Sequence, residues 1–133
     1  MEGNWKADDV KRINTPIDKF FRVWVEFLTP IHNLTNKEKE VFAALLKHRF
    51  ELQASITNED LLDSILMGRD VRAQIRQECN VSSPFFQGIL GKFKRNKVIV
   101  EDRINPKFIP KGITKDSKSF KFLIYFDFNA GNN

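Results

Sequence analysis

The chain has 133 residues, of which 41% are hydrophobic and 29% charged, and these proportions predict one globular domain with or without an arm. No apolar run reaches the roughly 18 residues of a membrane span, and one cysteine with two histidines excludes a disulfide framework and a structural zinc site. The 22 basic and 17 acidic residues give a net charge of +5, which alone is weak evidence for a polyanionic partner.

The N-terminal part is predicted to contain an arm and a strand. Residues 1–18 are polar, which favours a flexible or partner-docking arm with a short helix near residues 8–13. Residues 19–28 alternate along the chain and are mostly β-branched or aromatic, so we expect a strand rather than the alternative helix. Both faces of that strand carry aromatic side chains, which makes residues 19–28 the candidate surface for a homodimer.

Two capping sequences predict the next two helices. Thr35 and Glu38 have the spacing of a capping box, so a helix should run from there to about residue 50. Thr57-Asn58 has the composition of a second cap, and Gly68 is expected to end the short helix that it opens.

A pair of helices joined by a three-residue turn is predicted next. Asp70 is expected to cap a helix over residues 71–79, which Cys79 would end as a small buried residue. After the turn, Ser83 should cap a helix over residues 84–96 with Pro84 at its first position.

The C-terminal part is predicted to form two strands around a long basic loop. Residues 98–103 form the first strand, and residues 110–119 form a mobile loop rich in lysine, glycine and proline. Residues 120–128 alternate again, so we expect a second strand with its phenylalanines in the core. Residues 129–133 are expected to be a disordered tail.

The positive charge is concentrated in the second half of the chain. Residues 1–34 are neutral and residues 35–69 carry −1, whereas residues 70–133 carry +6. Within residues 84–121 ten basic residues accompany three acidic ones, which gives +7. Such a local excess favours an anionic partner over a merely solvated surface.

The order of these elements resembles that of winged helix-turn-helix domains. Residues 72–82 are similar to the first helix and turn of that motif, with Ala73 as the small residue at the helix crossing and Ile75 and Val81 as buried anchors. Residues 83–99 resemble the recognition helix and the start of the wing. The resemblance implies that the second helix enters the major groove and that the hairpin loop lies along the DNA backbone.

The fold class that follows is α+β. We expect a winged helix-turn-helix domain over residues 19–128, with three to four helices, a β-hairpin wing and an extra N-terminal strand.

A narrower resemblance points to winged-helix replication proteins of bacterial plasmids. The segments that carry it are Phe20-Phe21-Arg22-Val23-Trp24, Leu34-Thr35, Glu40-Val41-Phe42, Leu45-Leu46, Ile104-Asn105-Pro106 and Lys111-Gly112. The resemblance implies a plasmid or phage as the source. The only tyrosine, Tyr125, is expected inside a core strand rather than as a catalytic residue, so initiation of replication by this chain alone is not expected.

The apolar stripe of the helix over residues 84–96 determines which of its side chains face outward. The residues that we predict to face the DNA bases are Phe85, Gln87, Gly88, Gly91, Lys92 and Arg95. Gln87 can bind adenine through two hydrogen bonds, and Lys92 or Arg95 can reach guanine or phosphate. Gly88 and Gly91 allow either close approach to DNA or a partner, or tight packing against another helix.

A second set of residues is predicted to bind phosphates. These are Ser82, Ser83, Arg76, Lys94, Lys107, Lys111, Lys115 and Lys118. Ser82 and Ser83 join hydroxyls to a helix N-terminus, although simple capping is the alternative. Arg72 and Arg76 either add backbone contacts or form ion pairs along a solvated helix face.

The sequence thus predicts a non-enzymatic protein that binds double-stranded DNA, for transcription or replication control in a phage, plasmid or bacterium. Catalysis is not expected, because His32 and His48 lack a partnered nucleophile. We also expect the protein in the cytoplasm, without membrane contact, cofactor, metal or small-molecule substrate. The alternative is a structural adaptor, such as a phage particle component located in the virion, for which an exposed Phe85 would be suited. Binding of single-stranded nucleic acid through Phe108 and Phe120 is a third, less favoured hypothesis.

Overall fold

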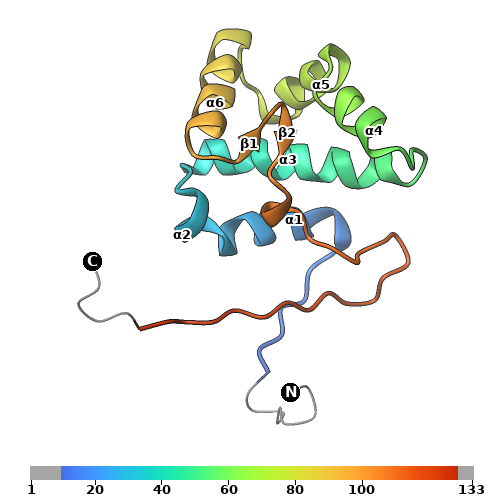
Figure 1. Cartoon of the computed structure of the whole chain (residues 1–133), viewed down its shortest axis with the longest axis vertical. Coiled ribbons are helices and arrows are strands. Elements are labelled where there is room, and N and C mark those ends of the chain that lie inside the picture. The colour runs from blue at the N-terminus through green and yellow to red at the C-terminus, as the bar shows by residue number, and fades with distance from the viewer. Residues whose placement is uncertain (1–9, 129–133) are drawn as a thin grey trace.

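The structure, a computed structural model, describes residues 10–128 and shows an α+β fold that is mostly helical. Its elements are α1 (Ile17–Phe27), α2 (Thr29–His32), α3 (Asn36–Gln53), α4 (Glu59–Leu66), α5 (Arg69–Cys79), α6 (Ser83–Arg95), β1 (Ile99–Val100), β2 (Arg103–Ile104) and the 3-10 helix η3 (Pro106–Phe108). The long α3 lies in the middle, with α1 along one side and α4 and α5 on the other (Figure 1). Residues 1–9, which are half of the predicted arm, and the whole predicted tail lie outside the described residues.

The predicted strand over residues 19–28 is wrong, because this segment forms α1. Phe21, Trp24, Val25 and Leu28 are buried, and their spacing of three, four and seven residues is that of one helix face. This face packs on α3 of the same chain. The extra N-terminal strand is therefore absent, and the inner face of the candidate dimer surface is already covered.

The capping box that opens α3 is confirmed. Thr35 Oγ1 accepts from the backbone N–H of Glu38, and the Glu38 carboxylate accepts from the N–H of Thr35 at 2.8 Å. The helix ends at Gln53, three residues later than the predicted residue 50. The Phe42 side chain of α3 is fully buried and contacts the rings of Phe93 and Phe108. Helix α3 therefore packs against both α6 and η3.

The next two helices meet at Gly68 with almost no linker. Asn58 caps α4 by accepting from the N–H of Leu61, as the sequence predicted for this segment. Gly68 caps α5, however, and Asp70 lies within the first turn of that helix instead of preceding it. A Cβ on Gly68 would come within 3.1 Å of the Ile65 carbonyl oxygen, so the absence of a side chain permits this sharp junction.

The three-residue turn between α5 and α6 is confirmed, with a shift of one residue in the cap. Asn80 ends α5 in the left-handed conformation, at φ 55°. Ser82, rather than Ser83, is the N-cap of α6, and its Oγ accepts from the N–H of Phe85. Pro84 therefore occupies the second helical position. A backbone N–H at this position would have no intrahelical acceptor, so the missing N–H of proline costs no helix hydrogen bond.

The predicted strand over residues 98–103 is in fact a whole hairpin. Ile99 pairs with Ile104 and Val100 with Arg103, so the antiparallel strands turn at Glu101 and Asp102. Both turn residues have positive φ, at 54° and 60°, which is the backbone of a tight two-residue hairpin. The hairpin loop is thus short and acidic instead of long and lysine-rich.

The second predicted strand, over residues 120–128, is not a strand. After η3 the chain returns to α1, where the Trp24 indole N–H donates to the Phe108 carbonyl at 2.7 Å. The following segment runs beside α1 in extended form without forming a ladder (Figure 1). Tyr125, expected in the core, is 76% exposed.

His32 is a fully buried polar side chain held as the neutral imidazole. Its Nε2–H donates to the Val25 carbonyl at 2.8 Å, and its Nδ1 accepts from the backbone N–H of Leu34 at 3.0 Å. A proton on Nδ1 would remove the second bond. Burial, only partly offset by the bond to Val25, lowers the pKa of His32 below its ordinary value of 6.5.

This arrangement predicts a loss of stability at mildly acidic pH. The unfolded chain takes up a proton at His32 near pH 6.5, whereas the folded chain does so only at lower pH. The free energy of unfolding should therefore fall as the pH drops from 6.5 toward the lowered pKa of the folded state. Urea unfolding between about pH 7 and pH 5 measures this. The variant His32→Gln should show a flatter pH dependence, and equal slopes for both proteins would contradict the prediction.

Candidate nucleic-acid interface

Helix α6 presents one long side away from the domain. Phe86, Ile89, Leu90 and Phe93 are buried and fix the inner side of the helix, as predicted. The opposite side carries the side chains predicted to read bases, of which Phe85, Gln87, Gly88 and Arg95 are exposed and Gly91 and Lys92 are half-buried. The sequence therefore identified the outward face of this helix correctly.

The two glycines of α6 have no packing partner within the described part of the chain. A Cβ on Gly88 would meet nothing within 4 Å, and one on Gly91 would meet only the Arg95 guanidinium at 3.5 Å. Tight packing against another helix of this chain therefore does not explain them. Each glycine weakens the helix by roughly 1 kcal/mol relative to alanine, so a bare backbone face is maintained against helix propensity.

Replacing Gly88 by alanine should raise the free energy of unfolding by about 0.5–1 kcal/mol, because the helix gains propensity and the Cβ enters open space. Chemical denaturation measures the change. Gly112→Ala is the matched control, since Gly112 has φ +77° and the same added methyl should destabilise the protein there. Loss of stability in Gly88→Ala would contradict the assignment of an open helix face.

Four cations of α5 and α6 have no anionic partner among residues 10–128. The side chains of Arg72 and Arg76 on α5, and of Lys94 and Arg95 on α6, form no ion pair there, so the expected pairing along α5 is not observed. The Nε of Arg72 is buried without a hydrogen-bond partner. Unpaired arginine and lysine side chains are the groups that bind phosphate.

Lys92 differs from these cations because it is already paired. Its ammonium lies 3.3 Å from the Glu38 carboxylate, which belongs to the capping box of α3. The predicted base contact of Lys92 thus competes with an ion pair that joins α6 to α3.

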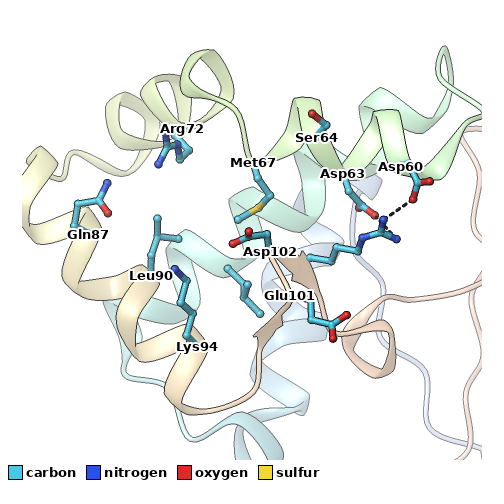
Figure 2. Close-up of a pocket in the computed structure, with 12 residues that line it drawn as sticks. Asp60, Asp63, Ser64, Met67, Arg72, Gln87, Leu90, Lys94, Glu101 and Asp102 are labelled. Carbon is cyan, nitrogen blue, oxygen red and sulfur yellow. Dashed lines mark hydrogen bonds and ion pairs between the residues drawn. The ribbon is translucent and has the colours of Figure 1, made fainter.

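A cleft of about 480 Å³ opens beside α6, between this helix, α4, α5 and the hairpin. Figure 2 shows Gln87, Leu90 and Lys94 on one wall with Arg72 near them. The other wall carries acidic residues from α4 and the hairpin turn. These are Asp60, Asp63, Glu101 and Asp102. The cleft is therefore divided by charge, with its basic wall on α5 and α6.

Arg103 partly neutralises the acidic wall. Its guanidinium bonds to Asp60 and lies 3.6 Å from Asp63, as the dashed line in Figure 2 illustrates for Asp60. Glu101 and Asp102 are exposed and form no ion pair among the described residues. The sequence analysis did not place Glu101 and Asp102 beside α6. One signal was available, because aspartate is enriched at positive φ and could have marked a turn at this position.

The lysines of the predicted wing lie elsewhere. Lys107, Lys111, Lys115 and Lys118 are exposed on the segment that follows the hairpin. Ile113 lies in a small hollow with Phe21 of α1, and the Phe120 ring meets the Trp24 ring edge-on, so this segment belongs to the α1 side of the domain (Figure 1). The structure does not bring these four lysines together with α6.

The N-terminus of α6 is open. Ser82 Oγ is used as the cap, whereas Ser83 is exposed at the first helical position. Within the described chain, Ser83 has the one free N–H of this first turn, because Pro84 has none and the N–H of Phe85 donates to Ser82 Oγ. This N–H and the Ser83 hydroxyl lie together at the exposed end of the helix.

The described residues contain no arrangement typical of a metal centre or nucleophile. No group of three or more metal-ligating side chains occurs among them. Cys79 is buried, and burial raises the pKa of its thiol to about 11. His48 lies 3.0 Å from Glu78 in a surface pair. In residues 10–128 no helix has both the length and the apolar character required to cross a membrane.

Comparison of the chain with models of protein families, with curated proteins and with solved structures gives no match. The case for its function therefore depends on the geometry and charge of α6 and its surroundings.

Proposed function

We propose that the protein is a winged helix-turn-helix DNA-binding protein that inserts α6 into the major groove. The proposal depends chiefly on the outward face of α6, where Gly88 leaves the backbone uncovered and Arg95 is unpaired, with the unpaired Lys94 and Arg72 on the wall of the adjoining cleft. Helix α5, the three-residue turn and α6 correspond to the two helices of the motif, and the hairpin of β1 and β2 to a very short wing.

Each part of this face has a role in the proposed complex. Gln87 and Arg95 read base edges, because both are exposed on the groove side of the helix. Gly88 and Gly91 let the helix backbone approach the bases closely. Lys94 and Arg72 bind phosphates from the basic wall of the cleft, and Ser83 binds one at the N-terminus of α6.

The acidic turn of the hairpin changes the proposed role of the wing. Glu101 and Asp102 would repel the DNA backbone, so the wing limits how the duplex docks instead of adding affinity. This division of charge confines the DNA to the α6 side of the cleft. The proposal therefore assigns phosphate binding to α5 and α6, and not to the lysines of residues 107–118.

Selection from a random pool of double-stranded DNA tests the proposal. A DNA-binding helix should enrich a defined sequence, and affinity for the selected duplex should fall steeply as salt increases, with a slope near −0.9 for each phosphate contact. Failure to enrich any sequence, together with a salt-independent affinity, would overturn it.

The adaptor function retains one specific observation in its favour. Phe85 is 53% exposed on α6, where it suits a protein contact better than a phosphate backbone. Under this alternative, α6 docks on an apolar partner surface, and Phe85→Ser abolishes assembly. Under the DNA proposal, Phe85 contacts a thymine methyl, and Phe85→Ser weakens binding at that position only.

A further inference from the structure

Residues 120–128 form an apolar strand-like segment without a strand partner. The segment contains no glycine or proline and alternates Phe120, Phe122, Ile124, Phe126 and Phe128 with other residues. Its first part rests on α1, where Phe122 lies 4.9 Å from the Trp24 ring. Toward its end, Phe126 is 80% and Phe128 92% exposed. Residues 118–128 form no backbone hydrogen bond among the described residues.

An unpaired extended backbone with a row of exposed aromatic side chains is a template for pairing with another strand. Within the described chain no such strand is available, because residues 99–104 pair with each other. The strand that the described residues do not supply can be supplied by the same segment of a second copy.

The segment is complementary to itself when it pairs antiparallel about Ile124. In that register Lys121 faces Asp127 of a second copy, and Asp127 faces its Lys121. Phe122 then faces Phe126, Phe120 faces Phe128, and Ile124 faces its own counterpart. Facing residues of an antiparallel pair share one side of the sheet, so all the phenylalanines gather on one side and both charge pairs on the other.

We propose that two copies of this chain form a two-fold symmetric dimer through antiparallel pairing of residues 120–128. Phe126 of the second copy would lie beside Phe122, within reach of Phe27 of α1, which is 47% exposed. The two-stranded ribbon is thus supported by a helix from each copy, as such a ribbon requires for stability. The same surface patch serves both copies, so the assembly closes at two.

This dimer is independent of the proposed DNA contact. Figure 1 shows residues 120–128 below α1, whereas α6 lies on the other side of α3. Both surfaces are therefore available at once in each copy, and a dimeric helix-turn-helix protein fits a palindromic site.

Exchanging the two charges tests the register. Asp127→Lys alone places like charges opposite each other twice in the dimer, as does Lys121→Asp alone. Each should raise the dimer dissociation constant roughly tenfold or more, measured by sedimentation equilibrium. The double variant Lys121→Asp/Asp127→Lys restores both pairs with exchanged sides and should recover the wild-type constant.

A second pair of variants tests the backbone pairing itself. Of Leu123→Pro and Ile124→Pro, the variant at the hydrogen-bonded position removes a donor at the centre of the ribbon and should give a monomer. Circular dichroism should show an unchanged helical fold for both, because Leu123 is 58% and Ile124 47% exposed. A monomeric wild type would overturn the proposal, as would association into open fibres. Equal dissociation constants for the wild type and both single charge variants would also overturn it.

Discussion

Replacing Lys94 and Arg95 together by glutamate is expected to weaken binding of double-stranded DNA roughly 100-fold at moderate salt. Lys94 lies on the basic wall of the cleft and Arg95 on the outward face of α6, and neither has an ion-pair partner among the described residues. The double variant removes two contacts and adds two repulsive charges. The slope of log affinity against log salt should also become shallower by about two.

Lys115→Glu/Lys118→Glu is the matched control for this experiment. It makes the same change in net charge on exposed side chains, but on the segment beside α1 instead of α6. The control should retain most of the wild-type affinity. An equal loss in both double variants would mean that the DNA follows overall charge, and the assignment of α6 as the binding helix would be wrong.

Replacing Phe42 by alanine should lower the free energy of unfolding by about 3–5 kcal/mol. Phe42 has no exposed surface, and its ring lies 5.6 Å from Phe93 of α6 and 5.8 Å from Phe108 of η3. Removing the ring leaves a cavity between α3, α6 and η3, so the contacts of α3 with both of the other elements are lost. Urea unfolding followed by circular dichroism measures the change.

Phe85→Ala is the control for this truncation. Phe85 is 53% exposed on α6 and lies outside the proposed dimer interface, so removing the same ring there should change the free energy of unfolding by at most about 1 kcal/mol. A cost near that value for Phe42→Ala would contradict the central position assigned to its ring.

Capping chemistry explains why most helices could be predicted from the sequence. The capping box of Thr35 and Glu38, the Asn58 cap and the turn at Asn80 depend on bonds between neighbours in the chain. Such local signals need no knowledge of the rest of the fold. The small errors, Gly68 instead of Asp70 and Ser82 instead of Ser83, arose where two nearby residues could each serve as the cap.

The α1 error had a different origin. Residues 19–28 alternate like a strand, yet Phe21, Trp24, Val25 and Leu28 also have helical spacing. Both patterns coexist because aromatic side chains are needed on two sides, one against α3 and the other against residues 120–122. Tertiary packing decided between the two periods, which local propensity cannot do.

The C-terminal strands could not be predicted because their pairing is non-local or atypical. Glu101-Asp102 lacks the glycine that usually marks a two-residue hairpin, so a hairpin looked like one strand. Residues 120–128 were expected to pair with the strand over residues 98–103. Because β1 pairs with β2 within that segment, no such strand is available to them. For the candidate site, the outward residues of α6 could be predicted from its apolar stripe. The position of the lysines of residues 107–118 could not be predicted, because they would lie in the hairpin loop only if residues 120–128 paired with residues 98–103.

Amide chemical-shift mapping with a selected DNA duplex shows directly whether α6 is the helix that binds DNA. We expect DNA to shift the amides of residues 82–95 and of the Arg72 region of α5, while residues 107–121 stay unchanged. Shifts confined to residues 107–121 would contradict it, and so would the absence of any shift in α6 at saturating DNA.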